Sequence, residues 1–210
     1  MSRRWIIRMG LAVVGFVAAA VEPPTVPAAD SAWLTDSIEV GLAFVTNLAI
    51  HESGHVLIAE GVGARTAPPK FFGEENGSYF LGLSTASGIP DDAVLTYRLG
   101  GEIASSYTFE LALRDYRNEP TTYNRALLLF SGTDFFWYTV YAFYLSPRED
   151  SRLDPVGIRE STGFSRSAIV TAAATQLAAN AWRVASGSDT VVPSFTYDRR
   201  SAMLNLTVTF

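Results

Sequence analysis

The chain contains no cysteine, which excludes disulfide bonds and cysteine-ligated metal sites. Only 18% of its 210 residues are charged, whereas soluble domains usually carry about 25%. Together with 48% hydrophobic residues, this composition favours a membrane setting or a deeply buried helical core. A net charge of −5 argues against a nucleic-acid partner. Gly100-Gly101 belongs to no phosphate-binding pattern, so no nucleotide is expected either.

Histidine is also scarce, and both histidines belong to one motif, His51-Glu52-Ser53-Gly54-His55. On a helix, residues four apart lie on one face, so His51 and His55 could bind a single Zn²⁺ ion. Glu52 emerges beside that face, where its carboxylate could act as a general base. We therefore predict His51 and His55 as zinc ligands and Glu52 as the catalytic residue. The alternative interpretation is a pair of histidines hydrogen-bonded inside a core helix.

The order of apolar and turn-forming residues predicts a mainly α-helical fold. The motif lies within an apolar stretch that predicts a helix over about 36–62. Further helices are predicted over about 91–115, 123–145 and 165–185. Residues 64–94 are rich in proline and glycine and predict a short β segment or, equally well, a plain connecting loop. We expect a zincin-like helical domain over 29–187, followed by a C-terminal β-hairpin tail over 188–210 with alternating polarity.

A catalytic zinc ion needs a third protein ligand, which here must be a carboxylate because both histidines are already used. Asp134 lies in the middle of the most hydrophobic stretch, where an ionisable group is costly without a cation. We predict Asp134 as the third ligand, with Glu102 and Asp154 as the alternatives. Asp134 could instead be a helix-interior aspartate bonded to a nearby hydroxyl group.

The first 28 residues have the pattern of an export signal. Arg3, Arg4 and Arg8 precede an apolar stretch over 9–21, and Val26-Pro27-Ala28 supplies small residues for cleavage. We expect a cleaved signal peptide over 1–28, with a retained N-terminal anchor as the alternative. The protein is therefore predicted to be exported, to the membrane or to the periplasm and cell envelope. The length of the 123–145 stretch would also allow a helix to span a bilayer.

The motif His51-Glu52-Ser53-Gly54-His55 in an apolar helix, followed by an aspartate in a later hydrophobic helix, resembles the site-2 protease family of membrane zinc metalloproteases. Around Asp134 the chain reads Phe130-Ser131-Gly132-Thr133-Asp134 and lacks the Leu-Asp-Gly pattern of that family. The resemblance implies His51, His55 and Asp134 as zinc ligands and Glu52 as the base. It also implies a membrane-embedded or membrane-proximal protein substrate.

The predicted function is a zinc metalloendopeptidase of the cell envelope that hydrolyses peptide bonds, with Glu52 as general base. Its expected partners are Zn²⁺, a protein or peptide substrate that could be membrane-embedded, and the membrane itself. Asn47, one turn before His51, could donate a hydrogen bond to the oxyanion or orient a ligand. The alternative function is an inactive, zincin-like envelope protein that binds or assembles with others.

Overall fold

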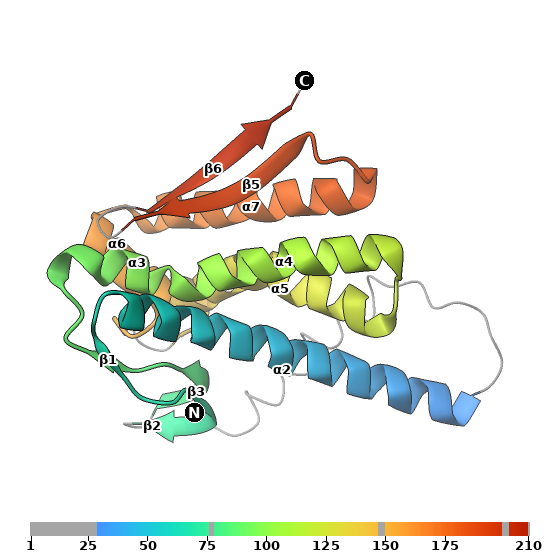
Figure 1. Cartoon of the computed structure of the whole chain (residues 1–210), viewed down its shortest axis with the longest axis horizontal. Helices are drawn as coiled ribbons and strands as arrows, with labels where there is room; N and C mark the ends of the chain where they lie inside the picture. The colour runs from blue at the N-terminus through green and yellow to red at the C-terminus, as the bar shows by residue number, and fades with distance from the viewer. Residues whose placement is uncertain (1–28, 76–77, 147–149, 199–201, 210) are drawn as a thin grey trace.

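The computed structural model describes residues 29–75, 78–146, 150–198 and 202–209, and its fold is mainly helical (Figure 1). The helices of these described residues, in chain order, are α2 (Ala29–Gly61), α3 (Val94–Arg98), α4 (Gly100–Asn118), α5 (Thr122–Val140), α6 (Asp154–Thr162) and α7 (Arg166–Ser186). The strands are β1 (Arg65–Thr66), β2 (Lys70–Glu75), β3 (Ser78–Leu83), β4 (Ala86–Ser87), β5 (Val191–Tyr197) and β6 (Ala202–Val208). The predicted mainly α class, with a small β segment after the motif helix and a C-terminal hairpin, is confirmed.

Helices α2, α4 and α5 pack side by side and form the part of the fold that carries the motif (Figure 1). At the crossing of α2 and α4, Gly54 faces Gly100, and a Cβ atom on Gly54 would overlap the Gly100 carbonyl oxygen. Glycine at both positions therefore lets the two backbones approach more closely than any side chain would allow. This close approach places the motif against the start of α4.

The largest apolar core lies between α4, α5, α6 and α7. Its buried residues are Leu99, Ile103, Phe135, Ala142, Phe143, Val156, Ile158, Ile169 and Ala173. The C-terminal hairpin is attached to this core, because the ring of Phe195 on β5 packs edge-on against Phe135, with 6.3 Å between ring centroids. Burial of these side chains fixes α6 and α7 relative to the motif-bearing helices.

The strands of the described residues form three separate two-stranded antiparallel sheets, with orders β1-β4, β2-β3 and β5-β6. The first two lie beside the C-terminal half of α2, whereas the β5-β6 hairpin lies over α7 (Figure 1). The hairpin pairs Val191 with Val208 and Phe195 with Leu204. For residues 64–94 the sequence predicted either a β segment or a plain loop, and the structure contains strands there.

The helices differ from the predicted ones in four respects, the first of which is that α2 begins at Ala29 rather than near residue 36. The predicted 91–115 helix begins as a 3-10 turn over Asp91–Ala93, continues as α3 and is interrupted at Leu99, after which α4 begins. The predicted 123–145 helix ends as a π-helical turn over Tyr141–Leu145. Helix α6 was not predicted. The predicted signal peptide over 1–28 lies outside the described residues.

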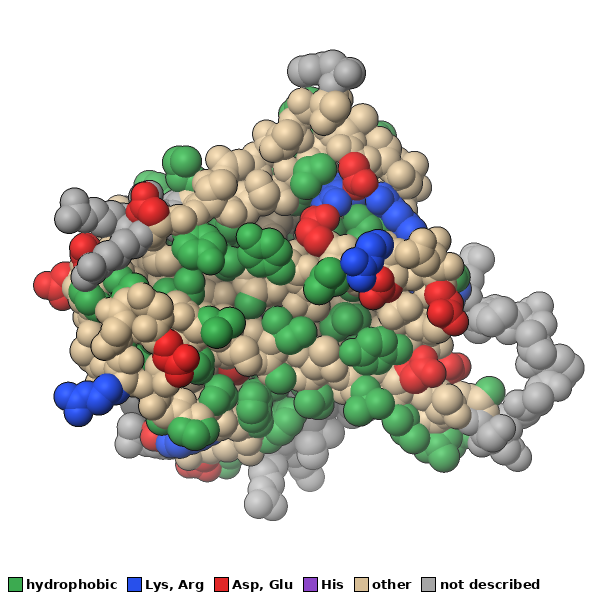
Figure 2. All heavy atoms as spheres, viewed as in Figure 1, with side chains coloured by type: hydrophobic (Ala, Val, Ile, Leu, Met, Phe, Trp, Pro, Cys, Tyr) green, Lys and Arg blue, Asp and Glu red, His purple; other side chains and the backbone are tan. Residues whose placement is uncertain are grey.

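One helix of the described residues, over Ala32–Gly61, is long and apolar enough to cross a membrane by length and composition. Signal sequences and core helices of soluble proteins meet the same criterion. Leu34, Ile38, Leu42 and Val45 on this helix are exposed. Figure 2 shows hydrophobic side chains spread over the face on which α2 and α4 lie.

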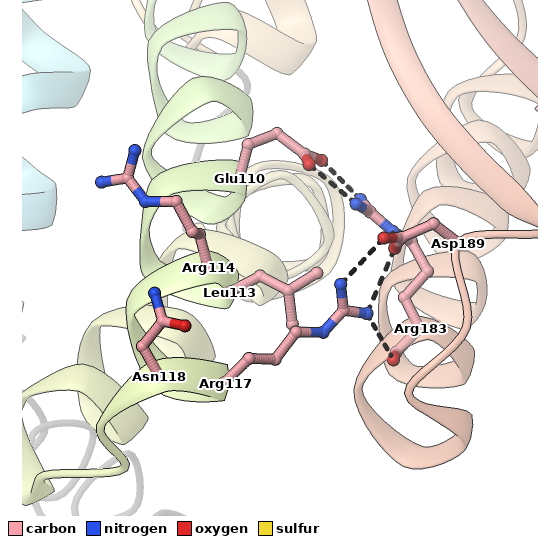
Figure 3. Close-up of a pocket in the computed structure, with 7 residues that line it drawn as sticks. All are labelled: Glu110, Leu113, Arg114, Arg117, Asn118, Arg183 and Asp189. Atoms are coloured by element: carbon pink, nitrogen blue, oxygen red, sulfur yellow. Dashed lines mark hydrogen bonds and ion pairs between the residues drawn. The ribbon is translucent and has the colours of Figure 1, made fainter.

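A charged network joins α4 to the end of α7, around a hollow of about 320 Å³ (Figure 3). The guanidinium group of Arg183 is buried and donates to both carboxylate oxygens of Glu110 and to Asp189. Arg117 donates to both oxygens of the same Asp189, at 2.8 and 3.2 Å. The charges of these four residues compensate one another. Their ion pairs to Asp189 form a clamp that holds the segment between α7 and β5 against α4.

Candidate metal centre

His51, His55 and Asp154 bring three possible metal-binding atoms together in the buried interior. The two Nε2 atoms lie 3.4 Å apart. Oδ2 of Asp154 lies 3.1 Å from Nε2 of His55 and 3.6 Å from Nε2 of His51. Ligand atoms about 2.1 Å from a tetrahedral ion are about 3.4 Å from one another, so these separations fit such an ion. The three residues could hold a metal ion.

The other ring nitrogen of each histidine is held by an acceptor. Nδ1 of His51 lies 2.7 Å from Oδ2 of Asp134, and Nδ1 of His55 lies 2.7 Å from the carbonyl oxygen of Tyr97. Both acceptors favour the tautomer in which Nδ1 carries the hydrogen. The Nε2 lone pairs are then free to point at the shared centre, as in metal-binding histidines generally.

Asp134, which the sequence predicted as third ligand, lies on the Nδ1 side of His51. Its carboxylate also accepts hydrogen bonds from the Asn47 amide at 3.1 Å and the Ser105 hydroxyl at 2.8 Å. The hydroxyl group that bonds to Asp134 therefore belongs to Ser105 on α4, and not to Ser131 or Tyr138, the nearby hydroxyl residues of its own helix. Asn47 therefore orients a neighbour of the site and is not placed to reach a substrate oxyanion.

Asp154, the alternative third ligand, is positioned by the start of α6. Its backbone N–H donates to the Tyr138 hydroxyl at 3.3 Å, and the Tyr138 ring packs edge-on against His51. Burial alone would raise the pKa of Asp154, but the two histidines outweigh burial and hold this pKa below its usual range. The carboxylate is therefore ionised, as a metal ligand must be.

Glu102, the other alternative, is almost completely buried close to His51 and Asp134. Both of its carboxylate oxygens lack a hydrogen-bond partner among the described residues. Burial, reinforced by the Asp134 charge, raises the pKa of Glu102 well above its usual range. A buried, unpartnered carboxylate is costly unless it is protonated or bound to a cation. Its His51–Glu102–Asp134 group is a second set of atoms close enough together to hold a cation.

The pKa of His51 depends on the carboxylates that surround its ring. Burial lowers its pKa, but the carboxylates of Asp134 and Asp154 outweigh burial and raise the pKa well above the usual histidine value. Without a metal ion, the ring therefore holds a second proton. A metal ion bound at Nε2 would replace that proton, so metal binding and proton release are linked at this residue.

Glu52 faces a small cavity beside the three possible ligands. Its Oε2 accepts a hydrogen bond of 2.6 Å from Ser84, just after β3. Gly82 packs against the carboxylate so closely that a Cβ atom there would overlap Oε1. The cavity has a volume of about 30 Å³, and its lining includes Glu52, His55 and Asp154. This volume is enough for a water molecule.

Sequence reasoning missed several residues that build this cavity. Ser84, Tyr97 and Tyr138 all line it, and Gly101 packs so tightly on His51 that a Cβ atom would overlap Nε2. The paired glycines at 100–101 were a usable signal, because adjacent glycines within a helical stretch indicate a close approach. The tyrosines and the serine carried no such signal.

Comparisons of this chain with protein families, with curated proteins and with solved structures give no match. The site itself is a buried His51–His55–Asp154 group that could hold a metal ion, with the Glu52 carboxylate on the same cavity.

Proposed function

We propose that the protein is a zinc-dependent metallopeptidase of the cell envelope, with His51, His55 and Asp154 as zinc ligands. The observation that carries the proposal is the convergence of both Nε2 atoms on Oδ2 of Asp154, 3.1 and 3.6 Å away. Two histidines and one carboxylate, with a free position for water, are the ligands of many catalytic zinc sites. Asp154 replaces Asp134 in this ligand set.

Zinc suits this set better than Mg²⁺, Ca²⁺ or Cu⁺ does. Imidazole nitrogen is a poor ligand for Mg²⁺ and Ca²⁺, which prefer oxygen, and the chain has no thiolate to favour Cu⁺. Asp134 and the Tyr97 carbonyl orient the two rings from behind, an arrangement that raises the basicity of zinc-binding histidines. When bound, zinc supplies a Lewis acid that polarises a carbonyl group and lowers the pKa of water.

The residues of the cavity fit the proton transfers of peptide hydrolysis. Glu52 accepts a proton from the attacking water and delivers it to the leaving amine. Ser84 holds the Glu52 carboxylate at the cavity wall. Burial raises the pKa values of Tyr97 and Tyr138, so both hydroxyls stay protonated and can donate to the oxyanion.

The expected substrate is an extended peptide segment at or near the membrane. Gly82, Leu83 and Ser84 at the end of β3 line the cavity, which supports a strand-like approach of the substrate along this segment. The exposed apolar side chains of α2 support an association with the membrane. The resemblance to the site-2 protease family agrees with both proposals.

One observation favours the second candidate, an inactive zincin-like envelope protein that binds or assembles with others. The cavity of about 30 Å³ accommodates water but not a peptide residue. An active peptidase therefore requires the segment of Gly82 and Ser84 to move away from Glu52 when substrate binds. An inactive binding protein requires no such opening.

The Glu52→Gln variant separates the two candidates. We expect it to bind one zinc ion per chain, as the wild type does, and to lose hydrolysis of an unfolded, fluorogenic protein substrate by at least about 10²-fold. Glu60→Gln, an exposed change on the same helix, is the matched control and is expected to keep full activity. Zinc binding without any hydrolysis by the wild type would favour the inactive protein. A wild-type chain that binds no zinc would contradict both candidates.

A further inference from the structure

The C-terminal hairpin has an edge that the rest of the described chain leaves open. β6 pairs with β5 along its whole length and with no other strand in the described residues. Each residue of a strand directs its backbone N–H and C=O to one side, so one edge of β6 presents unpaired groups. Such an edge is a template for a further strand.

The register of the hairpin shows which residues point outward. The N–H of Thr209 donates to the carbonyl of Thr190 at 2.9 Å, so this pair belongs to the hydrogen-bonded set of the antiparallel ladder. Pairs alternate along the ladder, and the even-numbered residues of β6 therefore direct their backbone groups away from β5. Pro193, which lacks an N–H, lies opposite Leu206, as this alternation requires. Leu204, Leu206 and Val208 form the open edge.

This edge lacks the features that protect exposed strands. Ala202–Val208 contains no charged residue and no proline, whereas β5 carries Pro193. Its side chains include Met203, Leu206 and Val208, which are 59%, 45% and 49% exposed. A long, uncharged and apolar edge favours strand pairing. A charged residue or a proline within β6 would disfavour such pairing.

We propose that β6 pairs antiparallel with β6 of a second copy of this chain, about a two-fold axis at Asn205. In this register Leu204 lies opposite Leu206 of the partner, and Met203 lies opposite Thr207. Leu204 of each copy and Leu206 of the other exchange backbone hydrogen bonds through their outward-facing N–H and C=O groups. Asn205 lies opposite Asn205 of the second copy, and these two residues exchange no backbone hydrogen bonds. The strand is thus complementary to itself, as a two-fold interface requires.

The inner face of the hairpin supports the same pairing. Leu204 lies beside Phe195, whose ring packs on Phe135 in the core, and Leu206 and Val208 follow on that face. The latter two remain half exposed, because the helical layer does not cover them. In the four-stranded sheet, Leu204 of the partner lies against Leu206, so both exposed side chains gain apolar neighbours.

The cysteine-free chain allows a direct test of the register. Asn205→Cys in the full chain places two thiols opposite each other across the axis, with Cα atoms about 4.5 Å apart, within disulfide range. Met203→Cys is the control on the same strand and face. Its two copies are separated by about 13 Å along the strands and cannot be bridged. Under mild oxidation we expect Asn205→Cys to form a covalent dimer on the order of tenfold faster, or more, on non-reducing gels.

A second variant tests the outward-facing hydrogen bonds. Leu206→Pro removes an N–H that the β5-β6 pairing does not use, so the hairpin is retained while self-pairing is lost. Leu206→Val keeps that N–H and serves as its control. We expect the wild type and Leu206→Val to have twice the mass of one chain by light scattering, and Leu206→Pro to have the mass of one. A monomeric wild type, or equal cross-linking of Asn205→Cys and Met203→Cys, would overturn the proposal.

Discussion

The Nδ1 atom of His51 lies 2.7 Å from Oδ2 of Asp134, while its Nε2 atom faces Asp154 at 3.6 Å. The two aspartates thus act on opposite sides of one imidazole ring. Asp134 fixes the tautomer and orientation of the ring. Asp154 lies where its carboxylate and the Nε2 atom of His51 could bind the same metal ion. Their roles differ although both are carboxylates next to the same residue, Asp154 buried and Asp134 partly exposed.

Substitution of the two aspartates separates these roles. We expect Asp154→Ala to lose zinc binding, because it removes one of three ligands. Asp134→Asn is expected to retain one zinc ion per chain, with affinity reduced by about 10–100-fold. Zinc content by mass spectrometry and competition with a chelating dye measure both effects. Loss of zinc in Asp134→Asn with retention in Asp154→Ala would reverse the assignment.

Gly101 tests the close packing of α4 on the motif. A Cβ atom there would overlap Nε2 of His51, so Gly101→Ala is expected to destabilise the fold by about 1–3 kcal/mol and to weaken zinc binding. Gly41→Ala is the control, because its Cβ meets nothing within 4 Å. That change is expected to stabilise α2 by about 1 kcal/mol. Urea denaturation of both variants gives the comparison, and equal stabilities would contradict it.

Glu102 gives the stability of the metal-free protein a pH dependence. Its pKa is raised in the folded state, so the fold holds a proton that the unfolded chain releases above its ordinary pKa. The free energy of unfolding therefore falls as pH rises between the two pKa values, by about 1.4 kcal/mol for each pH unit. Glu102→Gln removes this titration and keeps the shape of the neutral acid.

The variant should therefore match the wild type near pH 4 and become the more stable protein as pH rises, with chelator present throughout. Urea denaturation at several pH values measures the difference between the two proteins. Glu74→Gln, an exposed change on β2, should show no such divergence. A constant difference at all pH values would show that Glu102 is ionised in the fold.

Arg183 is expected to be the most sensitive residue of the charged clamp in Figure 3. Arg183→Met leaves Glu110 and Asp189 without this buried partner, and we expect a loss of about 2 kcal/mol because both carboxylates are partly exposed. Arg114→Met removes only an exposed pair with Asp115 and should change stability by less than about 0.5 kcal/mol. Thermal and urea denaturation measure both, and similar values would contradict a structural clamp.

The sequence was sufficient where the information is local. The spacing of His51 and His55 places both rings on one helical face, and α2 shows them in that position with Nε2 atoms 3.4 Å apart. The alternating residues of Ala202–Val208 predicted a strand, which the structure contains. Both predictions depend only on the periodicity of a helix or strand.

The sequence could not show which carboxylate lies beside both Nε2 atoms, the position that Asp154 has in the structure. Burial cost correctly indicates that Asp134 needs partners, but Asn47, Ser105 and His51 supply them without a metal ion. Asp154 reaches the site because α6 begins beside Tyr138, a tertiary contact without a periodic signal. Helix α6 itself was predictable from Pro155 in its first turn and Gly163 after its last.

The close pair of His55 and Asp154 also connects distant parts of the chain, because nearly half of the sequence lies between them. A metal ion bound to both would join the two ends of that long loop in the folded state and be released on unfolding, so its binding free energy would add to the stability of a chain that has no disulfide. Zinc would then act in this cysteine-free protein as a reversible cross-link of the folded state. Chelation would loosen the fold as reduction loosens a disulfide-bonded one.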